Sequence, residues 1–110
     1  YGQDMDMYQQ MVEEQVLESE DEGILILTDL FGGSPFMIST RVYEKYCKKI
    51  SIEIICGMNL SMVVEVASAL KQNLSLDVMK QIALDSGHKG IIDFSELLSN
   101  TLPKRKENEK

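Results

Sequence analysis

Positive charge, long apolar runs and cysteine are all scarce in this 110-residue sequence, and each scarcity excludes a class of protein. Lys and Arg number 11 against 18 Asp and Glu, so the formal net charge of −7 argues against a general nucleic-acid binder. No apolar run approaches membrane-spanning length, and no signal peptide is visible. Cys47 and Cys56 lie in apolar surroundings, which favours reduced thiols of a cytosolic protein over a disulfide or a metal site. We expect one domain with no cofactor.

The most informative stretch runs from Thr28 to Pro35. It follows an unbroken apolar run, residues 24–27, which is typical of a strand covered on both faces. Ser34 is predicted to be the N-cap of a helix and Pro35 its first residue. The intervening Gly32 and Gly33 allow a sharp turn and a close approach of a ligand to the backbone.

A strand that leads through two glycines into a helix start can hold an anion at the positive end of the helix dipole. Asp29 would repel a phosphate there unless a proton-carrying ring, most naturally a histidine, lies between them. The same turn also occurs in α/β proteins as a simple tight corner, so a phosphate site and a structural turn both stay open from these residues alone.

The order of the other elements predicts an α/β fold with an open, mainly parallel sheet and flanking helices. Gly87 is expected to follow the end of one helix as its C′ residue. Residues 1–100 are expected to form the domain, and residues 101–110, which lack apolar side chains after Leu102, a disordered tail or a linker. The predicted elements are helix 1–19, strand 24–28, helix 35–46, strand 50–56, helices 61–71 and 76–86, and a short strand 90–94.

Two polar side chains, Asp29 and Asn59, each follow the C-terminal end of a predicted strand. In open parallel sheets, ligands bind at the edge where the carboxyl ends of the strands meet. Two loops that point to one edge therefore strengthen the prediction of a binding site there.

Three ordered motifs resemble the mannose-type enzyme IIA domains of the bacterial sugar phosphotransferase system. Residues 26–36 resemble the signature loop of that family, and residues 56–62 resemble its second loop. Residues 86–94 resemble its C-terminal end, especially in the N-acetylgalactosamine and gluconate branches. The resemblance covers about residues 1–100.

The resemblance implies a phosphotransferase component that takes a phosphoryl group from the phosphocarrier protein onto a histidine. It would pass the group to a IIB domain, with the membrane IIC and IID components involved indirectly. Asp29 matches the family position that orients this histidine by a hydrogen bond, and Ser34 matches the position that lies near the phosphoryl group. The resemblance implies the same roles here. The resemblance also implies a homodimer, in which the strand at residues 90–94 exchanges between subunits as an antiparallel edge. We further expect phosphoryl or partner binding at Gly32, Gly33, Pro35 and Asn59.

One departure from the family concerns the acceptor itself. The family histidine lies in a His-Gly loop after the first strand, and no such strand, loop or histidine occurs in this sequence. We expect that a strand–helix–strand unit, on the order of 40 residues, is missing from this sequence. The sequence could be part of a larger chain, it could have been trimmed, or the unit could be supplied by another chain. The first strand of this unit would lie beside strand 24–28. The only histidine, His88, is predicted to be a surface residue at a helix C-terminus and not the acceptor.

Three other interpretations stay open at this point. The chain could be a non-catalytic regulatory IIA-like domain, as in sugar-responsive transcription activators. It could be a receiver-like domain with Asp29 as the acceptor, although the acidic pair and the lysine of receivers are not seen. It could also be a nucleotide- or small-molecule-binding domain of flavodoxin type.

Overall fold

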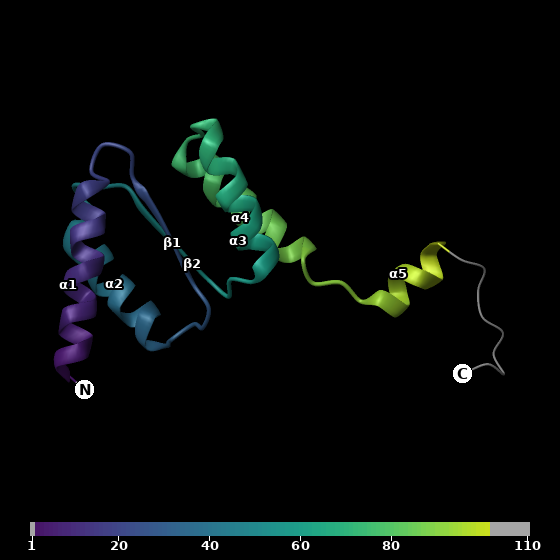
Figure 1. The fold of residues 1–110 in the computed structure, drawn as a ribbon, viewed down its shortest axis with the longest axis horizontal. Coiled ribbons are helices and arrows are strands. Elements are labelled where there is room, and N and C mark those ends of the chain that lie inside the picture. Colours follow the sequence, from purple (N-terminus) through teal and green to yellow (C-terminus); the bar gives the residue numbers. More distant parts are fainter. Residues whose placement is uncertain (1, 102–110) are drawn as a thin grey trace.

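The structure is a computed structural model that describes residues 2–101, with side chains described for residues 5–100. Two strands lie between two pairs of helices, and a last helix stands on an arm away from the rest (Figure 1). Because of this arm, the molecule extends 60 Å along its longest axis, against 37 and 19 Å along the other two axes. The elements are α1 (Gly2–Glu18), β1 (Ile24–Thr28), α2 (Ser34–Tyr46), β2 (Ile52–Cys56), α3 (Leu60–Ala69), a 3₁₀ turn (Leu70–Gln72), α4 (Leu76–Lys89) and α5 (Phe94–Thr101).

The sheet within the described residues consists of β1 and β2, which pair in parallel. Ile24 lies opposite Ile52, and the register continues without a break to Thr28 opposite Cys56. Both strands therefore end at the same edge, which we call the carboxyl edge. The parallel pairing and flanking helices confirm the α/β fold with an open parallel sheet.

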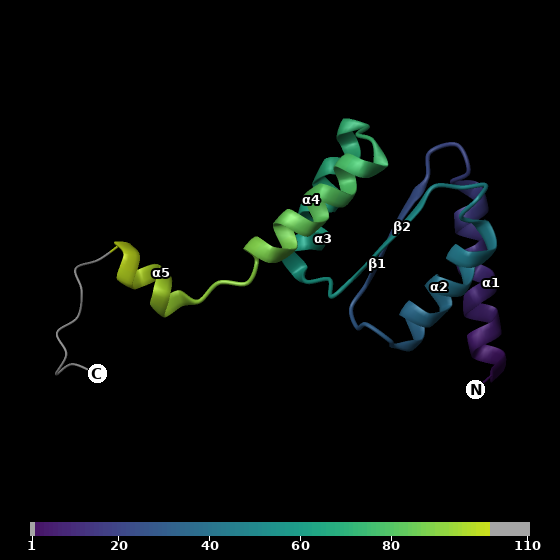
Figure 2. The same ribbon diagram turned by 180° about the vertical axis from the view of Figure 1, so that it is seen from behind.

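Side chains alternate along β1 between two hydrophobic clusters, one on each face of the sheet. Ile24 and Ile26 pack on the cluster that includes Val16 of α1 and Val42 of α2. Leu25 and Leu27 pack on the other cluster, which is built on α3, α4 and Ile55. The prediction that this strand is covered on both faces is confirmed. The view from behind shows the same two helix pairs on either side of the strands (Figure 2).

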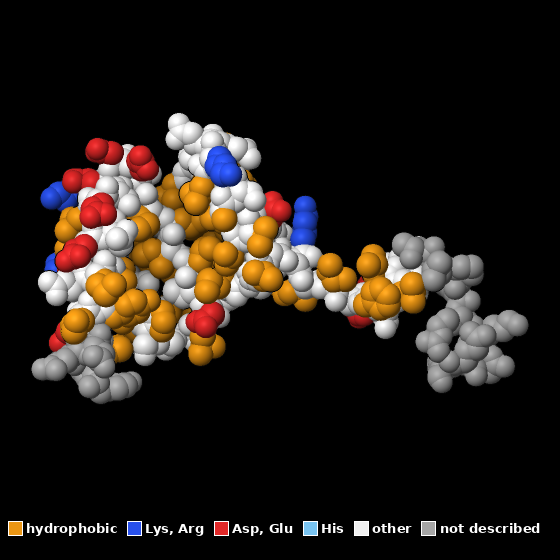
Figure 3. All heavy atoms as spheres, in the orientation of Figure 1, with side chains coloured by type: hydrophobic (Ala, Val, Ile, Leu, Met, Phe, Trp, Pro, Cys, Tyr) orange, Lys and Arg blue, Asp and Glu red, His pale blue; other side chains and the backbone are white. Residues whose placement is uncertain are grey.

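The α1–α2 pair is joined by polar contacts as well as by its core. Glu13 of α1 accepts hydrogen bonds from Lys45 Nζ at 3.0 Å and from Tyr46 Oη at 3.1 Å, both on α2. The hydrogen bond from Lys45, followed by one from Gln9, lowers the pKa of Glu13 below its ordinary value. Acidic side chains gather over the upper end of this layer, while hydrophobic ones gather between the two helix pairs (Figure 3).

The α3–α4 pair packs closely because of a glycine. We expected Gly87 just after the end of its helix, but α4 continues to Lys89 and Gly87 is buried within it. A Cβ atom added at Gly87 would lie 2.6 Å from Met62 Cε of α3. The sequence therefore places a glycine there for close helix packing, and the expectation of a helix C′ residue is wrong.

The predicted strand at residues 90–94 is not a strand. Residues 91–93 have no regular structure, and Phe94 begins α5. Asp93 starts that helix, because its Oδ1 accepts a hydrogen bond from Glu96 N–H at 3.2 Å and its backbone oxygen accepts one from Leu97 N–H at 3.0 Å. The sequence Asp-Phe-Ser-Glu is a capping-box pattern, which stabilises a helix start locally, whereas a strand needs a neighbouring strand for its backbone hydrogen bonds.

Two further expectations concern the C-terminal tail and the absence of a membrane-spanning segment. The predicted tail falls almost wholly outside the described residues, which end with Thr101 in α5. Among the helices that the structure describes, none is long and apolar enough to cross a membrane.

Candidate functional site

The loop between β1 and α2, residues 29–33, lies at the carboxyl edge, and we call it the first loop. Its turn is closed by a hydrogen bond from Gly33 N–H to Leu30 O at 3.1 Å. Gly32 has a φ of +84°, a backbone conformation that side chains disfavour, and no heavy atom lies within 4 Å of where its Cβ would be. The first loop therefore presents open backbone on the side of Gly32.

The start of α2 differs by one residue from the prediction. Ser34 is the first residue of the helix and not its N-cap, which is Gly33, and Pro35 comes second. Gly33 has no side chain, so no side-chain hydrogen bond caps this helix. The first N–H groups of a helix have no partner within the helix, and they are usually satisfied by a cap, by water or by a ligand. The start of α2 is thus open to an anion.

Asp29 is the first residue of this loop and Ser34 follows its last residue, and both are exposed. Within the described part of the chain, neither side chain has a hydrogen-bond partner. A carboxylate and a hydroxyl that are exposed, near a helix N-terminus and free of internal partners can both bind a group that arrives from outside. The functional roles assigned to them from the sequence stay predictions.

Exposed apolar side chains also belong to the first loop, and the sequence analysis did not single them out. Phe31 is 74% exposed and Leu30 65% exposed. The ring of Phe31 packs on that of Phe36, with a centroid distance of 4.7 Å and an interplanar angle of 45°. No helical or strand periodicity brings these two rings together, but their positions on either side of Gly-Gly-Ser-Pro were a visible signal. They give the loop an apolar rim.

The loop between β2 and α3, residues 57–59, is the second loop. Its Met58 N–H donates to O of Thr28, the last residue of β1, at 3.0 Å. The two loops thus lie at one edge of the sheet, as the sequence predicted. Asn59 caps α3, because its Oδ1 accepts from Met62 N–H at 3.0 Å. Its Nδ2 donates to Gly87 O of α4 at 2.8 Å. Both polar atoms of this amide are therefore engaged inside the protein.

Thr28 is the last residue of β1 and is only 5% exposed. Its Oγ1 is buried and has no hydrogen-bond partner among the described residues. No pattern in the sequence predicts that this hydroxyl is unsatisfied, since a buried side-chain hydroxyl usually has a hydrogen-bond partner in the protein or in ordered water. The unsatisfied atom lies one residue before Asp29.

His88 is exposed in the last turn of α4. It lines a hollow of about 120 Å³ beside the second loop, together with Cys56 and Gly57, and no described residue of the first loop lines that hollow. α4 packs on the face of the sheet opposite to the face that carries α2. This placement supports the prediction that His88 is a surface residue at a helix end.

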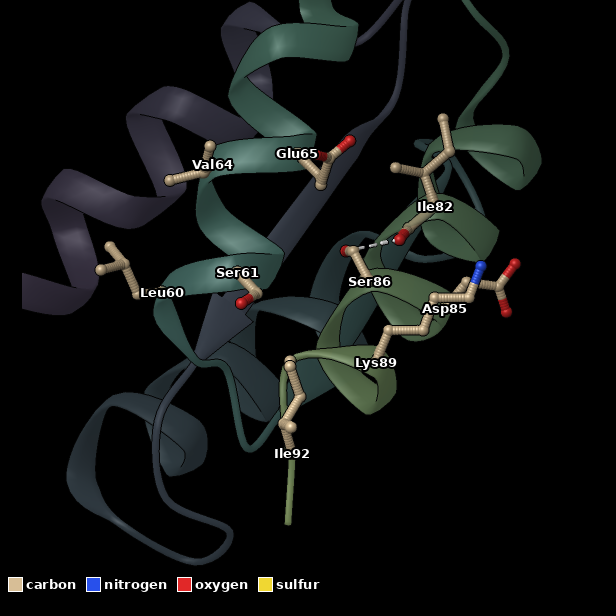
Figure 4. A pocket seen from close by; sticks show the side chains of 10 residues that line it. Leu60, Ser61, Val64, Glu65, Ile82, Asp85, Ser86, Lys89 and Ile92 are labelled. Carbon is tan, nitrogen blue, oxygen red and sulfur yellow. Dashed lines mark hydrogen bonds between the residues drawn. The ribbon is translucent and has the colours of Figure 1, made fainter. Parts of the chain in front are cut away.

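A larger groove, about 730 Å³, runs between α3 and α4 on the side away from the sheet (Figure 4). Apolar side chains such as Leu60 and Val64 line it, and Ser86 in its wall donates its hydroxyl hydrogen to Ile82 O. No residue of the first loop lines it among those described. The groove is thus separate from the open start of α2.

Comparisons with known proteins identify a family and several relatives for this chain. The family model described as "PTS system fructose IIA component" matches residues 1–84. The PTS system mannose-specific EIIAB component of Escherichia coli (strain K12) is 34% identical over 70 residues, which are 64% of this chain and 21% of that protein. The same values hold for the EIIAB component of Shigella flexneri. This chain thus matches about a fifth of the length of these curated relatives.

The fold is also similar to a solved structure. The crystal structure of phosphotransferase system component EIIA from Streptococcus agalactiae matches with a TM-score of 0.72 and 30% sequence identity. The match covers 84% of this chain and 68% of that one.

Proposed function

This chain belongs to the family of PTS fructose IIA components, and from that premise we propose that it relays phosphoryl groups during sugar uptake. In this proposal a phosphocarrier protein donates the group to a histidine of the IIA unit, and a IIB domain accepts it. The membrane IIC and IID components act afterwards, and the relay takes place in the cytoplasm. The bond between phosphorus and the donor atom of the phosphocarrier breaks as the P–N bond to the acceptor histidine forms.

One observation carries the proposal: the uncapped start of α2 at the carboxyl edge. Gly33 leaves the helix N-terminus without a side-chain cap, and Gly32 leaves the adjacent backbone uncovered. A phosphoryl group carries negative charge, which the positive end of the helix dipole and open N–H groups stabilise. Pro35, as the second residue of the helix, has no N–H to offer but sets the backbone for helix formation.

The two exposed polar side chains have distinct roles in this proposal. Asp29 accepts a hydrogen bond from the N–H of the acceptor imidazole, which fixes the tautomer with the other ring nitrogen free to attack phosphorus. Ser34 donates its hydroxyl hydrogen to a phosphoryl oxygen. Both side chains are exposed and without internal partners in the described chain, so neither has to break a hydrogen bond to act.

The acceptor histidine must reach the start of α2, and His88 lies on the opposite side of the sheet. We therefore assign the acceptor to a segment outside the described residues, on a strand that pairs with the free edge of β1. Within the described sheet, β1 has only β2 as a neighbour. The added strand would end at the carboxyl edge, beside Asp29.

A homodimer is the second part of the proposal. The arm that leaves α4 carries Ile91, Ile92 and Phe94, which are 78%, 66% and 68% exposed. Three large exposed apolar side chains within four residues are costly to leave in water. Exchange of this arm with a second subunit would bury them. Light scattering at micromolar concentration should show a dimer, and Ile92→Asp should shift it toward monomer.

The relay itself is tested by measuring intact mass after incubation with phosphoenolpyruvate, enzyme I and phosphocarrier. The intact protein, by which we mean this chain together with the segment proposed to carry the acceptor histidine, should gain one phosphoryl group. Its His88→Ala variant should gain the group equally. The 110-residue chain alone should gain none. Absence of any gain by the intact protein would contradict the relay and favour a regulatory IIA-like domain. A gain that His88→Ala abolishes would instead contradict the placement of the acceptor.

A further inference from the structure

Asn59 lies at the carboxyl edge like Asp29, yet its surroundings differ from those of a ligand contact. Its side-chain oxygen caps α3 through Met62 N–H, and its side-chain nitrogen holds Gly87 O of α4. An amide whose oxygen and nitrogen both have good internal partners gains little by turning toward a ligand, because it would leave two groups unsatisfied. Asn59 instead fixes the second loop to two helices.

The second loop in turn fixes the peptide group that contains the nitrogen of Asp29. Met58 N–H donates to Thr28 O at 3.0 Å. The carbonyl of Thr28 and the N–H of Asp29 belong to one planar peptide group. A hydrogen bond that holds the carbonyl oxygen therefore also fixes the orientation of the backbone N–H of Asp29. Gly57, with a φ of +86°, allows the chain to turn so that Met58 N–H meets this carbonyl.

We propose that Asn59 is a positioning residue for Asp29, acting through Met58 and the Thr28–Asp29 peptide group. The series of contacts runs from α4 through the amide of Asn59 and the second loop to the first loop. It holds the carboxylate of Asp29 at a constant place relative to the start of α2. The kinetic part of this inference rests on the proposed phosphoryl relay, whereas its structural part does not.

The most selective variant is Asn59→Asp. Aspartate is as good an N-cap as asparagine, so the bond to Met62 N–H and the start of α3 are retained. A carboxylate cannot donate, and it would face the carbonyl oxygen of Gly87, so the tie to α4 is lost. Ser75→Ala is the matched control. Ser75 caps the N-terminal end of α4 through Val78 N–H at 3.3 Å. Its removal therefore costs a helix cap at the end of α4 opposite to Gly87.

The first readout is the backbone amide resonance of Asp29 in the two-dimensional NMR spectrum of the intact protein. Asn59→Asp should shift this resonance and those of the first loop, and Ser75→Ala should leave them in place. An unchanged resonance of Asp29 in a folded Asn59→Asp variant would overturn the inference, whether or not the protein accepts phosphate. This readout therefore separates failure of the positioning from failure of the relay.

The second readout is the kinetics of phosphoryl transfer. A small misplacement of a positioned group is costly, so kcat should fall about tenfold in Asn59→Asp while KM for the phosphocarrier changes by less than about twofold. Ser75→Ala should keep both constants. The double variant with Asp29→Asn should be no slower than Asp29→Asn alone, because the effect of Asn59 passes through Asp29. A rise in KM with unchanged kcat, or a further loss in the double variant, would make Asn59 a direct contact and overturn the inference.

Discussion

The two loops at the carboxyl edge occupy equivalent places and use their hydrogen-bonding groups in opposite ways. Each follows a parallel strand, contains a glycine of positive φ and leads into a helix. The helix after the second loop is capped by Asn59, which also binds the neighbouring helix. The helix after the first loop has a glycine at its cap, and the side chains of Asp29 and Ser34 have no internal partner among the described residues.

This difference separates a loop that holds the structure from a loop that is available to a ligand. A loop whose hydrogen-bond donors and acceptors are all paired internally is stabilised but has no free polar group with which to bind a ligand. A glycine cap in place of a side-chain cap costs stability, about a few tenths of a kcal/mol, and keeps the first N–H groups of the helix available for an anion. We therefore expect substitutions in the first loop to affect transfer more than stability, and substitutions in the second loop to affect both.

The largest effect is expected from Asp29→Asn. The amide is close in size to the carboxylate but is neutral and can bind the wrong tautomer of the acceptor imidazole, so phosphoryl transfer should slow on the order of 10²-fold. The circular dichroism spectrum and melting temperature should stay near those of the wild type, because Asp29 is exposed. Rapid-quench measurement of transfer from the phosphocarrier checks the rate. Unchanged kinetics would remove Asp29 from the mechanism.

Gly33→Ser should make the first loop resemble the second. Gly33 has a φ of −73°, which serine adopts without strain, and the nearest atom to its added Cβ, Leu30 O, lies at 3.4 Å. The new hydroxyl can cap α2, which should raise the free energy of unfolding by a few tenths of a kcal/mol. The same cap should compete with the phosphoryl group and slow transfer about tenfold. Chemical denaturation measures the expected gain in the free energy of unfolding, and transfer kinetics on the same preparation measure the expected loss of rate. Gly33→Ala, which adds a Cβ without a cap, is the control.

The contrast between the loops also explains what could be predicted from the sequence. The run Ile24–Thr28 and the loop after it were predictable because apolar length, paired glycines and a proline are local signals. The exact cap of α2 was not, because Ser34 and Gly33 are both acceptable caps and only the backbone decides. The role of Asn59 depends on Gly87, which lies 28 residues further along the chain, and sequence spacing carries no sign of that contact.

The arm shows a different limit of sequence-based prediction. Gly90-Ile-Ile-Asp-Phe has the composition of a short strand, but a strand forms only beside a partner strand, and in the described chain this segment pairs with neither β1 nor β2. Asp93 and Glu96 supply a helix start that needs no partner. Local capping therefore decided the conformation of this segment. The capping-box spacing of Asp93 and Glu96 is a local signal in the sequence, and here it outweighs the strand propensity of the apolar residues before it.

A smaller effect is expected from Gly87→Ala, which tests the support of the second loop. The added methyl group would meet Met62 Cε at 2.6 Å, so that flexible side chain or the helix must move. Overpacking of this kind should lower the free energy of unfolding by about 1–3 kcal/mol. Because Gly87 O is the partner of Asn59, transfer should also slow, although less than in Asn59→Asp. Asp85→Ala on the exposed side of α4 should change stability by less than about 0.5 kcal/mol. Equal stability of the two variants would contradict close packing of α3 on Gly87.

The smallest effect is expected from Glu13→Gln. Glu13 lies on α1 and belongs to neither loop, so this variant tests whether a change in stability alone affects transfer. The hydrogen bond from Lys45, then that from Gln9, lowers the pKa of Glu13 in the folded protein. A group whose pKa is lower when folded contributes stability above its unfolded pKa, about 4.3 for glutamate, and this contribution is lost as the pH falls through the folded value. The Lys45 side chain is 58% exposed, so solvent screens the pair and the contribution is small. Glu13→Gln should therefore melt slightly below the wild type at pH 7, and the two proteins should converge in acid. Transfer kinetics should be unchanged, and a slower transfer in this variant would show that stability alone can produce the effects assigned to the first loop.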